Sequence, residues 1–307
     1  MNKCPFFGIC GGCKYNFMAP DYHAQKLDEI RNIPITGDPI WIPAYSRRRA
    51  EFAFADGKFG FLMHRSKTIV PITQCPLLAP EINEILPRLA DLPWGGNGTC
   101  LVTSCDNGID VYVVSPVPYF STIFKKSAES IGAIRIMWND KVVAQSGDQI
   151  VSFDNHRVEY TSGAFLQPTR QSEKILRDMV ISAVGDLRPV ADLFCGLGNF
   201  TFALNAAGFD INGIGIKRDL FANPLNVKSL NQFACVVMDP PRAGAMAQCG
   251  QIAKSNVKKI IYISCNPQTW MRDAKILTNG GYTNTENIPI DQFVGSSHWE
   301  LFSIFEK

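Results

Sequence analysis

The sequence predicts an α/β protein in two parts, a mainly β part followed by a doubly wound parallel sheet with helices. The chain has 307 residues, which is long for one small core and typical of two domains. Apolar residues alternate in short runs between about residues 49 and 161, as in half-buried strands. From about residue 165, apolar runs alternate with helical segments instead, which is typical of a parallel sheet.

Composition indicates a globular chain with no membrane-spanning part. Hydrophobic residues make up 46% and charged residues 19%. No apolar run reaches the length of a membrane helix, and the first residues lack the features of a signal peptide, so we expect a cytoplasmic protein. A net charge of +2 permits nucleic-acid binding without requiring it.

The first part begins with a cysteine- and glycine-rich region, residues 1–40, in which residues 21–31 are expected to form a helix. A hairpin is expected within residues 49–72, turning at Asp56-Gly57, because Asp-Gly between apolar runs is a strong hairpin signal. A helix over residues 80–90 follows. Further strands are expected at residues 101–103, 111–114, 134–138 and 158–161.

The second part is predicted to open with a helix over residues 169–184. Its strands are expected at residues 190–194, 209–214, 234–238 and 259–264. We therefore divide the chain into residues 1–40, 41–164 and 165–307. Sheets of this kind build their sites just past the carboxyl ends of the strands, so motifs at those places are the candidates for function.

A glycine-rich motif, Asp192-Leu-Phe-Cys-Gly196-Leu-Gly198, follows the first of these strands. Its glycines would let backbone amides approach a ligand where a helix begins, which is typical of a nucleotide pocket. A tight structural turn is the alternative reading.

Two more motifs follow later strands. The first, Ser264-Cys265-Asn266-Pro267, places a thiol at the carboxyl edge of the sheet. The second, Asp239-Pro240-Pro241-Arg242, places an acidic and a basic side chain at the same edge, on a loop that its prolines stiffen. The alternative for Cys265 is a buried structural thiol. That reading is the first choice for Cys100, Cys105, Cys235 and Cys249.

Together these motifs resemble the RNA uridine-5-methyltransferase family, over nearly the whole chain. The resemblance implies a Rossmann-like domain that uses S-adenosyl-L-methionine, preceded by a mainly β RNA-binding domain. It also implies that Cys265 is the nucleophile, that Asp239 contacts the target base and that Glu300, in His298-Trp-Glu300, accepts a proton. The cofactor-binding residues that it implies, or that lie in the matching motifs, are Phe165, Gln167, Asp192, Gly196, Gly198, Asp219 and Asp239.

The chemistry of this family explains why a thiol and a carboxylate are needed together. Uracil C5 is too weak a nucleophile to take a methyl group directly, so thiolate addition at C6 first makes it an enolate. A base must then remove the C5 proton, for which Glu300 is the candidate and His298 the runner-up.

Four cysteines of the first part form a second constellation, namely Cys4, Cys10, Cys13 and Cys75. By spacing alone, four thiolates could bind zinc or an iron–sulfur cluster. The pattern resembles the ribosomal RNA members of the family, and this resemblance implies a [4Fe-4S] cluster with a structural or RNA-positioning role.

Two departures from the family stand out. The acidic residue that ends the second strand and grips the cofactor ribose has no evident counterpart, because residues 211–215 run directly into Lys217-Arg-Asp219. In addition, no TRAM RNA-binding domain precedes Cys4. RNA would then be held by the β domain, where Arg47-Arg48-Arg49 with Phe52 and Phe54 form the best basic and aromatic cluster, unless those charges are only a solvated strand edge.

The expected substrate is RNA, most of all 23S ribosomal RNA, with no obligate protein partner. Three alternatives stay open at this point. The chain could be a degenerate RNA-binding module with little turnover, a tRNA uridine-5 methyltransferase or an RNA cytosine-5 methyltransferase. A flipped or unpaired base is expected as the target, because the reacting carbons are stacked inside a duplex.

Overall fold

The computed structural model describes residues 4–117 and 121–307. The chain divides into two compact units, which we call the first and the second unit. The first contains residues 1–23, 43–170 and 294–296, and the second contains residues 24–42, 171–293 and 297–307. The predicted three-part division at residues 40 and 164 stays a prediction.

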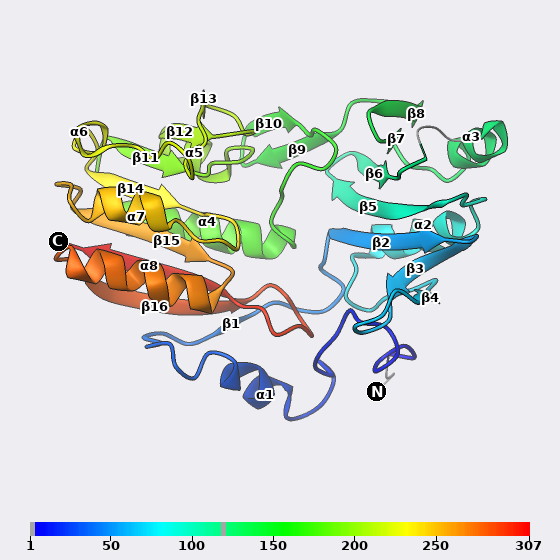
Figure 1. The fold of residues 1–307 in the computed structure, drawn as a ribbon, viewed down its shortest axis with the longest axis horizontal. Helices are drawn as coiled ribbons and strands as arrows, with labels where there is room; N and C mark the ends of the chain where they lie inside the picture. Colours follow the sequence, from blue (N-terminus) through cyan, green and yellow to red (C-terminus); the bar gives the residue numbers. More distant parts are fainter. Residues whose placement is uncertain (1–3, 118–120) are drawn as a thin grey trace. The chain divides into compact units, whose positions relative to one another are not determined.

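A seven-stranded sheet forms the centre of the first unit (Figure 1). All neighbouring strands are antiparallel except β6 and β7, which are parallel. Apolar side chains of two helices, α2 (Pro80–Ala90) and α3 (Thr122–Glu129), join its core. In spatial order the strands are β4 (Ile69–Pro71), β3 (Lys58–Leu62), β2 (Arg49–Ala55), β5 (Asn97–Cys105), β6 (Gly108–Val114), β7 (Arg135–Trp138) and β8 (Lys141–Gln145).

Most of the predicted elements of this unit are confirmed. The hairpin of β2 and β3 turns at Asp56 and Gly57, both with positive φ, as predicted. The predicted helix over residues 80–90 is α2. The strand predicted near residues 158–161 is wrong as a member of this sheet, because β10 (His156–Glu159) pairs only with β9 (Ile150–Phe153) in a separate two-stranded ribbon.

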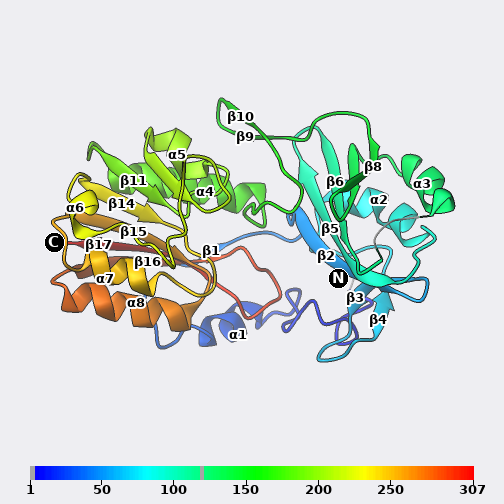
Figure 2. The same ribbon diagram turned by 45° about the horizontal axis from the view of Figure 1, so that its top comes forward.

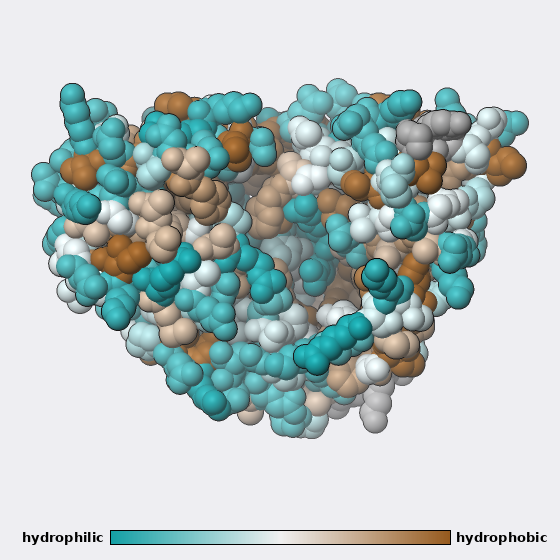
Figure 3. All heavy atoms as spheres, in the orientation of Figure 1, coloured by the Kyte–Doolittle hydropathy of each residue, from teal (hydrophilic) through white to brown (hydrophobic). Residues whose placement is uncertain are grey.

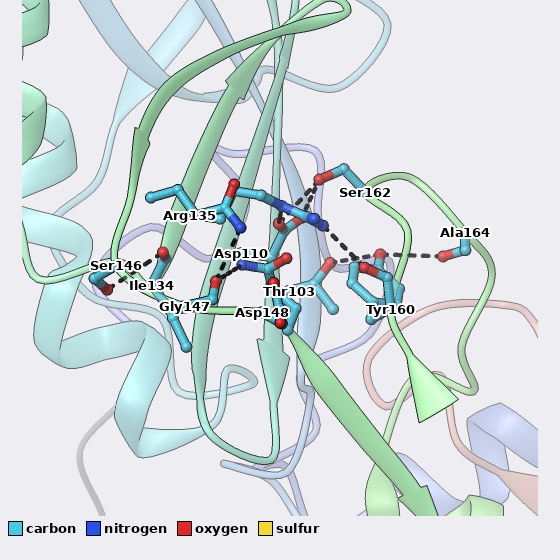
Figure 4. A network of polar contacts seen from close by, with 12 residues as sticks. Thr103, Asp110, Ile134, Arg135, Ser146, Gly147, Asp148, Tyr160, Ser162 and Ala164 are labelled. Carbon is cyan, nitrogen blue, oxygen red and sulfur yellow. Dashed lines mark hydrogen bonds and ion pairs between the residues drawn. The ribbon is translucent and has the colours of Figure 1, made fainter. Parts of the chain in front are cut away.

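A buried polar network ties the sheet to the segment that follows β10 (Figure 4). Arg135 Nε lies 2.7 Å from Asp110 Oδ1, and the Ser162 hydroxyl donates to the same carboxylate. Arg135 also donates to the backbone oxygen of Tyr160, whose hydroxyl donates to the backbone oxygen of Ala164. The network therefore fixes residues 160–164, immediately before Phe165 and Gln167.

The second unit is a doubly wound eight-stranded sheet, which confirms the predicted fold class. In spatial order its strands are β1 (Ile40–Trp41), β16 (Thr283–Asp291), β17 (Glu300–Glu306), β15 (Lys259–Ser264), β14 (Cys235–Met238), β11 (Val190–Leu193), β12 (Ala207–Asp210) and β13 (Ile216–Lys217). The five strands from β15 to β13 run parallel.

Helices cover both faces of this sheet. Figure 2 shows α4 (Arg170–Val184) and α5 (Asn199–Leu204) on one side and α7 (Met246–Ile252) and α8 (Pro267–Asn279) on the other. Two further helices, α1 (Tyr22–Asp28) and α6 (Val227–Leu230), complete the helices of the described residues. One predicted strand is misplaced, since β12 covers Ala207–Asp210 rather than residues 209–214.

The last two strands, β16 and β17, were not predicted. β17 is antiparallel to both β15 and β16, so that its first residue, Glu300, lies at the edge where the parallel strands end. The strands at the centre carry almost no exposed side chains, as expected where helices cover both faces.

Among the described residues, no helix has the length and apolar character needed to cross a membrane. Figure 3 shows hydrophilic side chains spread across the visible face, with the hydrophobic ones in small separate groups.

Candidate active site

Strand order and register bring the motifs of the second unit to one edge of its sheet. Leu193 is paired with Met238, and Met238 with Tyr262, so β11, β14 and β15 end close together. Asp239 and Cys265 directly follow the last two of these strands. Because Ser264 pairs with Leu301 across an antiparallel ladder, Glu300 lies beside Cys265. The three residues predicted to carry the chemistry therefore share one site.

The Ser-Cys-Asn-Pro motif folds as a strand end followed by a helix start. The Asn266 side chain accepts a hydrogen bond from the backbone N–H of Gln268 and caps α8, and Pro267 occupies the first turn. Asn266 Nδ2 also donates to the backbone oxygen of Arg242 at 3.0 Å, and so does the Thr269 hydroxyl at 3.2 Å. The thiol loop and the Asp-Pro-Pro-Arg loop are thus joined.

A buried carboxylate stabilises the thiol loop and the Asp-Pro-Pro-Arg loop. Asp273, on α8, accepts hydrogen bonds from the Tyr262 hydroxyl and from the backbone N–H of Ala245, each at 2.7 Å. Tyr262 belongs to β15 and Ala245 follows the Asp-Pro-Pro-Arg loop, so helix, strand and loop are held to each other.

The electrostatics of the site act on the thiol in opposite directions. Burial raises the pKa of Cys265 to about 12, the negative charges of Glu300 and Asp239 raise it as well, and Arg242 lowers it. The arginine therefore favours the thiolate, which is the reactive form.

The Glu300 side chain is almost completely buried, with 2% of its surface exposed. Burial first, and then the neighbouring charge of Asp239, raise the pKa of Glu300 well above its ordinary value, while a hydrogen bond from Gln292 lowers it. A carboxyl group of this kind can take up a proton near neutral pH.

The other thiols and the second candidate base occupy different surroundings. Cys100, Cys105, Cys235 and Cys249 are fully buried, as predicted for structural cysteines. The His298 ring packs edge-on against Phe293, and its backbone oxygen accepts a hydrogen bond from Lys26. The charges that act on Cys265 are those of Glu300, Asp239 and Arg242.

The glycine motif forms a loop whose backbone requires glycine. Gly196 and Gly198 have φ of 52° and 95°, in the left-handed region. Asp192 is fully buried beneath the loop, where its Oδ2 accepts from the Thr201 hydroxyl of α5 at 2.6 Å. Burial raises the pKa of Asp192 to about 7. Asp192 therefore braces the loop, and its direct contact with a cofactor stays a prediction.

One sequence-based prediction is wrong here, because the second strand does end in an acid. Asp210 is the last residue of β12, and its Oδ2 accepts from the backbone N–H of Gly196 at 3.1 Å. Asp210 Oδ1 accepts from Asn212 N and Gly213 N, both at 2.8 Å, and β13 begins at Ile216. The chain therefore turns directly after Asp210 and then enters β13.

The five residues after Asp210, residues 211–215, lie against the glycine loop, and we call them the strap. Ile214 N donates to the Gly196 oxygen at 2.8 Å, and the Cys195 thiol donates to the Ile214 oxygen. A side-chain Cβ at Gly213 would lie 2.2 Å from the Gly196 oxygen, so only glycine allows this approach. The strap and Asp210 therefore form hydrogen bonds with backbone groups of the glycine loop.

The remaining cofactor candidates belong to different places. Asp219 follows β13 and caps a turn by accepting from Phe221 N and Ala222 N. Phe165 and Gln167 belong to the first unit, where Phe165 is 60% exposed beneath the Arg49 guanidinium and Gln167 is buried. Their part in cofactor binding stays a prediction.

The predicted basic and aromatic cluster is not a single surface. Phe52 and Phe54 are 1% exposed and belong to the core of the first unit, so neither presents a stacking face for RNA. Arg48 is buried and donates to the Gln167 backbone oxygen, whereas Arg49 donates to the Gly163 oxygen. The inward positions of β2 alternate with its outward ones, which explains why adjacent arginines separate.

The four N-terminal cysteine candidates converge on one cavity of the first unit. Cys4, Cys10, Cys13 and Cys75 line it together with Arg47, and its volume is about 270 Å³. Burial and the charges of the other three thiols raise the pKa of Cys13 to about 12. Among the described residues, no three His, Cys, Asp or Glu side chains come close enough to hold a single metal ion.

Comparison with known proteins agrees with the fold. Residues 217–307 match the family model described as tRNA (Uracil-5-)-methyltransferase. An RNA methyltransferase of Agrobacterium fabrum is 31% identical over 98% of this chain and 83% of its own. A 23S rRNA (uracil(1939)-C(5))-methyltransferase of Vibrio parahaemolyticus is 26% identical over 99% and 81%. The structure of the Pyrococcus abyssi tRNA (uracil-54, C5)-methyltransferase, solved with S-adenosyl-L-homocysteine, has a TM-score of 0.71, covers 93% of this chain and 82% of that one, and is 20% identical.

The doubly wound sheet with its glycine loop has the fold of that methyltransferase structure. The chain belongs to the RNA uracil-5-methyltransferase family.

Two residues of this site were missed at the level of sequence. Gln292 donates to Glu300, and Asp210 contacts the glycine loop. Asp210 could have been found from the apolar run that it ends, whereas Gln292 lies after a strand that Pro289 and several polar residues disguise.

Proposed function

We propose that the protein methylates C5 of a uridine in 23S ribosomal RNA, by way of a covalent bond between Cys265 and C6. The observation that carries this proposal is the shared edge at which a thiol, two carboxylates and an arginine meet. Ribosomal RNA is favoured because the four-cysteine pattern resembles the ribosomal branch and because the Vibrio parahaemolyticus relative is named for 23S rRNA. Such a substrate would place the enzyme in the cytoplasm, in keeping with ten free thiols.

In the proposed mechanism, the Cys265 thiolate forms a bond to C6, and the electron pair of the C5–C6 double bond moves towards C5. When bound, S-adenosyl-L-methionine would supply the methyl group that C5 takes, and S-adenosyl-L-homocysteine would be left. Glu300 then accepts the C5 proton, the double bond forms again and the C6–S bond breaks, which returns the Cys265 thiolate. Asp239 contacts the base and fixes its orientation.

The residues that would hold S-adenosyl-L-methionine are those around the glycine loop. Gly196 and Gly198 allow a close approach of backbone, and Asp210 supplies a carboxylate suited to ribose hydroxyls. The proposed set also includes Asp219, Asp192 under the loop, and Phe165 and Gln167, which precede α4 in the sequence. Asp239 borders both cofactor and base.

A [4Fe-4S] cluster is proposed for the cavity of the first unit, ligated by Cys4, Cys10, Cys13 and Cys75. Four thiols around about 270 Å³ suit a cluster of several atoms, whereas a zinc ion needs its ligands within about 2.3 Å of one point. Four iron and four sulfide per chain are expected on analysis, and loss of both in Cys75→Ser. Zinc on all four thiols, with no sulfide, would rule the cluster out.

A second candidate function is favoured by the strap. Because Asp210 and Ile214 already bond to the backbone of the glycine loop, the chain could be an RNA-binding module with little affinity for S-adenosyl-L-methionine. Calorimetry distinguishes the two, since the methyltransferase binds the cofactor and the module does not.

Nucleoside mass spectrometry of a treated 23S RNA transcript tests the main proposal. We expect 5-methyluridine with the wild type and none with Cys265→Ala, which should still bind S-adenosyl-L-methionine. Cys105→Ala, at a buried cysteine of the first unit, serves as the matched control and should remain active. Product made by Cys265→Ala, or 5-methylcytidine in place of 5-methyluridine, would contradict it.

A further inference from the structure

The Glu300 carboxylate is held by a neighbouring amide that the mechanism above does not use. Gln292 Nε2 donates to Glu300 Oε2, and both side chains are 2% exposed. The hydrogen bond is buried. The other oxygen, Glu300 Oε1, is buried and has no hydrogen-bond partner among the described residues.

The backbone explains how this pair is brought together. Ile290 of β16 pairs with Glu300 of β17, so Gln292 leaves the sheet at the edge where Cys265 lies. Glu300 thereby has one oxygen fixed and one left for a ligand or water, which is the arrangement that a proton acceptor requires.

A buried lysine holds the two segments that carry the pair. Lys26 Nζ donates to the backbone oxygens of Phe293, at 3.1 Å, and His298, at 2.8 Å, and it lies 2.6 Å from Asp291 Oδ1. Trp299 Nε1 in turn donates to the Lys26 backbone oxygen. The residue after Gln292 and the two before Glu300 are therefore tied to one point of α1.

We propose that Gln292 is a positioning residue, which orients the Glu300 carboxylate towards the C5 proton and keeps it ionised. An amide N–H donates to either form of a carboxyl group but binds the anion more strongly. The groups that face Glu300 are Gln292, Asp239 and Cys265. Asp239 and burial act against the ionised form, so the amide counteracts them. This inference rests on the proposed role of Glu300 as the base.

The expected effect is a slower release of the covalent intermediate rather than weaker binding. In Gln292→Leu, which keeps the volume and removes the donor, the pKa of Glu300 should rise further. Less of the base is then ionised at a given pH, so the acidic limb of the kcat profile should move to higher pH by about one unit, and kcat near pH 7 should fall about 10- to 100-fold. KM for RNA should change less than twofold.

Asn287→Leu is the matched control. Asn287 is a fully buried amide on β16, the strand that Gln292 follows, and it bonds to the Pro34 oxygen and to Asn284 instead of the site. It should lower thermal stability without moving the pH profile.

The test combines that profile with a titration that needs no turnover. The carboxyl ¹³C signal of Glu300, assigned by its loss in Glu300→Gln, is followed against pH in the wild type, Gln292→Leu and Asn287→Leu. A higher midpoint in Gln292→Leu alone supports the proposal, even if the wild type makes no 5-methyluridine, a result that would defeat only the proposed function. An unchanged midpoint in Gln292→Leu would overturn it, whether or not the wild type methylates RNA.

Discussion

At the scale of single residues, the site depends on charges that oppose each other around one thiol. Glu300 and Asp239 disfavour the Cys265 thiolate, and Arg242 favours it. Sequence could predict Asp239, Arg242 and Cys265 because their motifs follow strand ends, whereas Glu300 was predicted from the resemblance to the family. It could not predict Gln292, whose role depends on a contact with a residue eight positions away across an antiparallel pair.

Removal of the positive charge should weaken the nucleophile. In Arg242→Gln the pKa of Cys265 should rise, because the thiolate loses its stabilising cation, so less thiolate exists at any given pH. We expect methylation to fall at pH 7 and to recover in part at pH 9, as measured by transfer of a labelled methyl group. Equal loss at both pH values would show that Arg242 acts through RNA binding instead.

Asp192 should make folding stability depend on pH. Its pKa in the folded protein is raised to about 7 from an ordinary value of 3.8, so the folded state binds the proton more tightly than the unfolded state. Its contribution therefore falls as the pH rises from about 4 to 7. Urea unfolding at pH 5 and pH 8 should show a smaller difference in Asp192→Asn than in the wild type, and a larger difference would refute this.

At the scale of elements, the strap joins two neighbouring parallel strands by a short connection. The β12 strand ends in Asp210, and five residues lead from it to β13. Sequence reasoning failed here because it treated residues 209–214 as one apolar strand, whereas Asp210 turns the chain by accepting two backbone hydrogen bonds.

Loss of the Asp210 carboxylate should act on the cofactor before it acts on RNA. Asp210→Ala removes the acceptor of three backbone N–H groups and the proposed ribose contact. We expect affinity for S-adenosyl-L-methionine to fall about tenfold or more by calorimetry, with RNA affinity unchanged. Asp186→Ala, at an exposed aspartate, is the control, and tighter cofactor binding in Asp210→Ala would instead identify the strap as a competitor.

The Asp110–Arg135 pair should support the first unit only as a pair. Arg135→Met leaves the Asp110 carboxylate, whose pKa burial already raises, without its cation, at a cost of about 3–5 kcal/mol. The double variant Arg135→Met with Asp110→Leu should recover much of this in denaturant unfolding. A double variant no more stable than the single one would show that the pair is not coupled.

At the scale of the whole molecule, the two units have separate constellations, a cysteine cavity in the first and a thiol–carboxylate site in the second. The fold class could be predicted because the spacing of apolar residues changes near residue 165. The assignment of residues 24–42 to the second unit and of residues 294–296 to the first could not be predicted, because it depends on contacts between residues far apart in sequence. For example, Lys14 N and Tyr15 N both donate to the Gly295 oxygen.

Removal of iron from the proposed cluster should loosen one unit selectively. We expect hydrogen exchange to rise around residues 4–23 and 294–296 after oxidation and chelation, while the glycine loop keeps its protection and S-adenosyl-L-methionine still binds. Loss of cofactor binding together with iron would contradict the structural role proposed for the cluster.

The central claim is that Cys265 forms a covalent bond to C6 of a uridine in RNA. The direct measurement uses 23S RNA that contains 5-fluorouridine, followed by peptide mapping of the enzyme–RNA adduct. Glu300 cannot remove fluorine from C5 as it removes a proton, so the C6–S bond cannot break after methyl transfer. In the presence of S-adenosyl-L-methionine we therefore expect a stable, methylated adduct at Cys265. No adduct, or an adduct at any other cysteine, would contradict it.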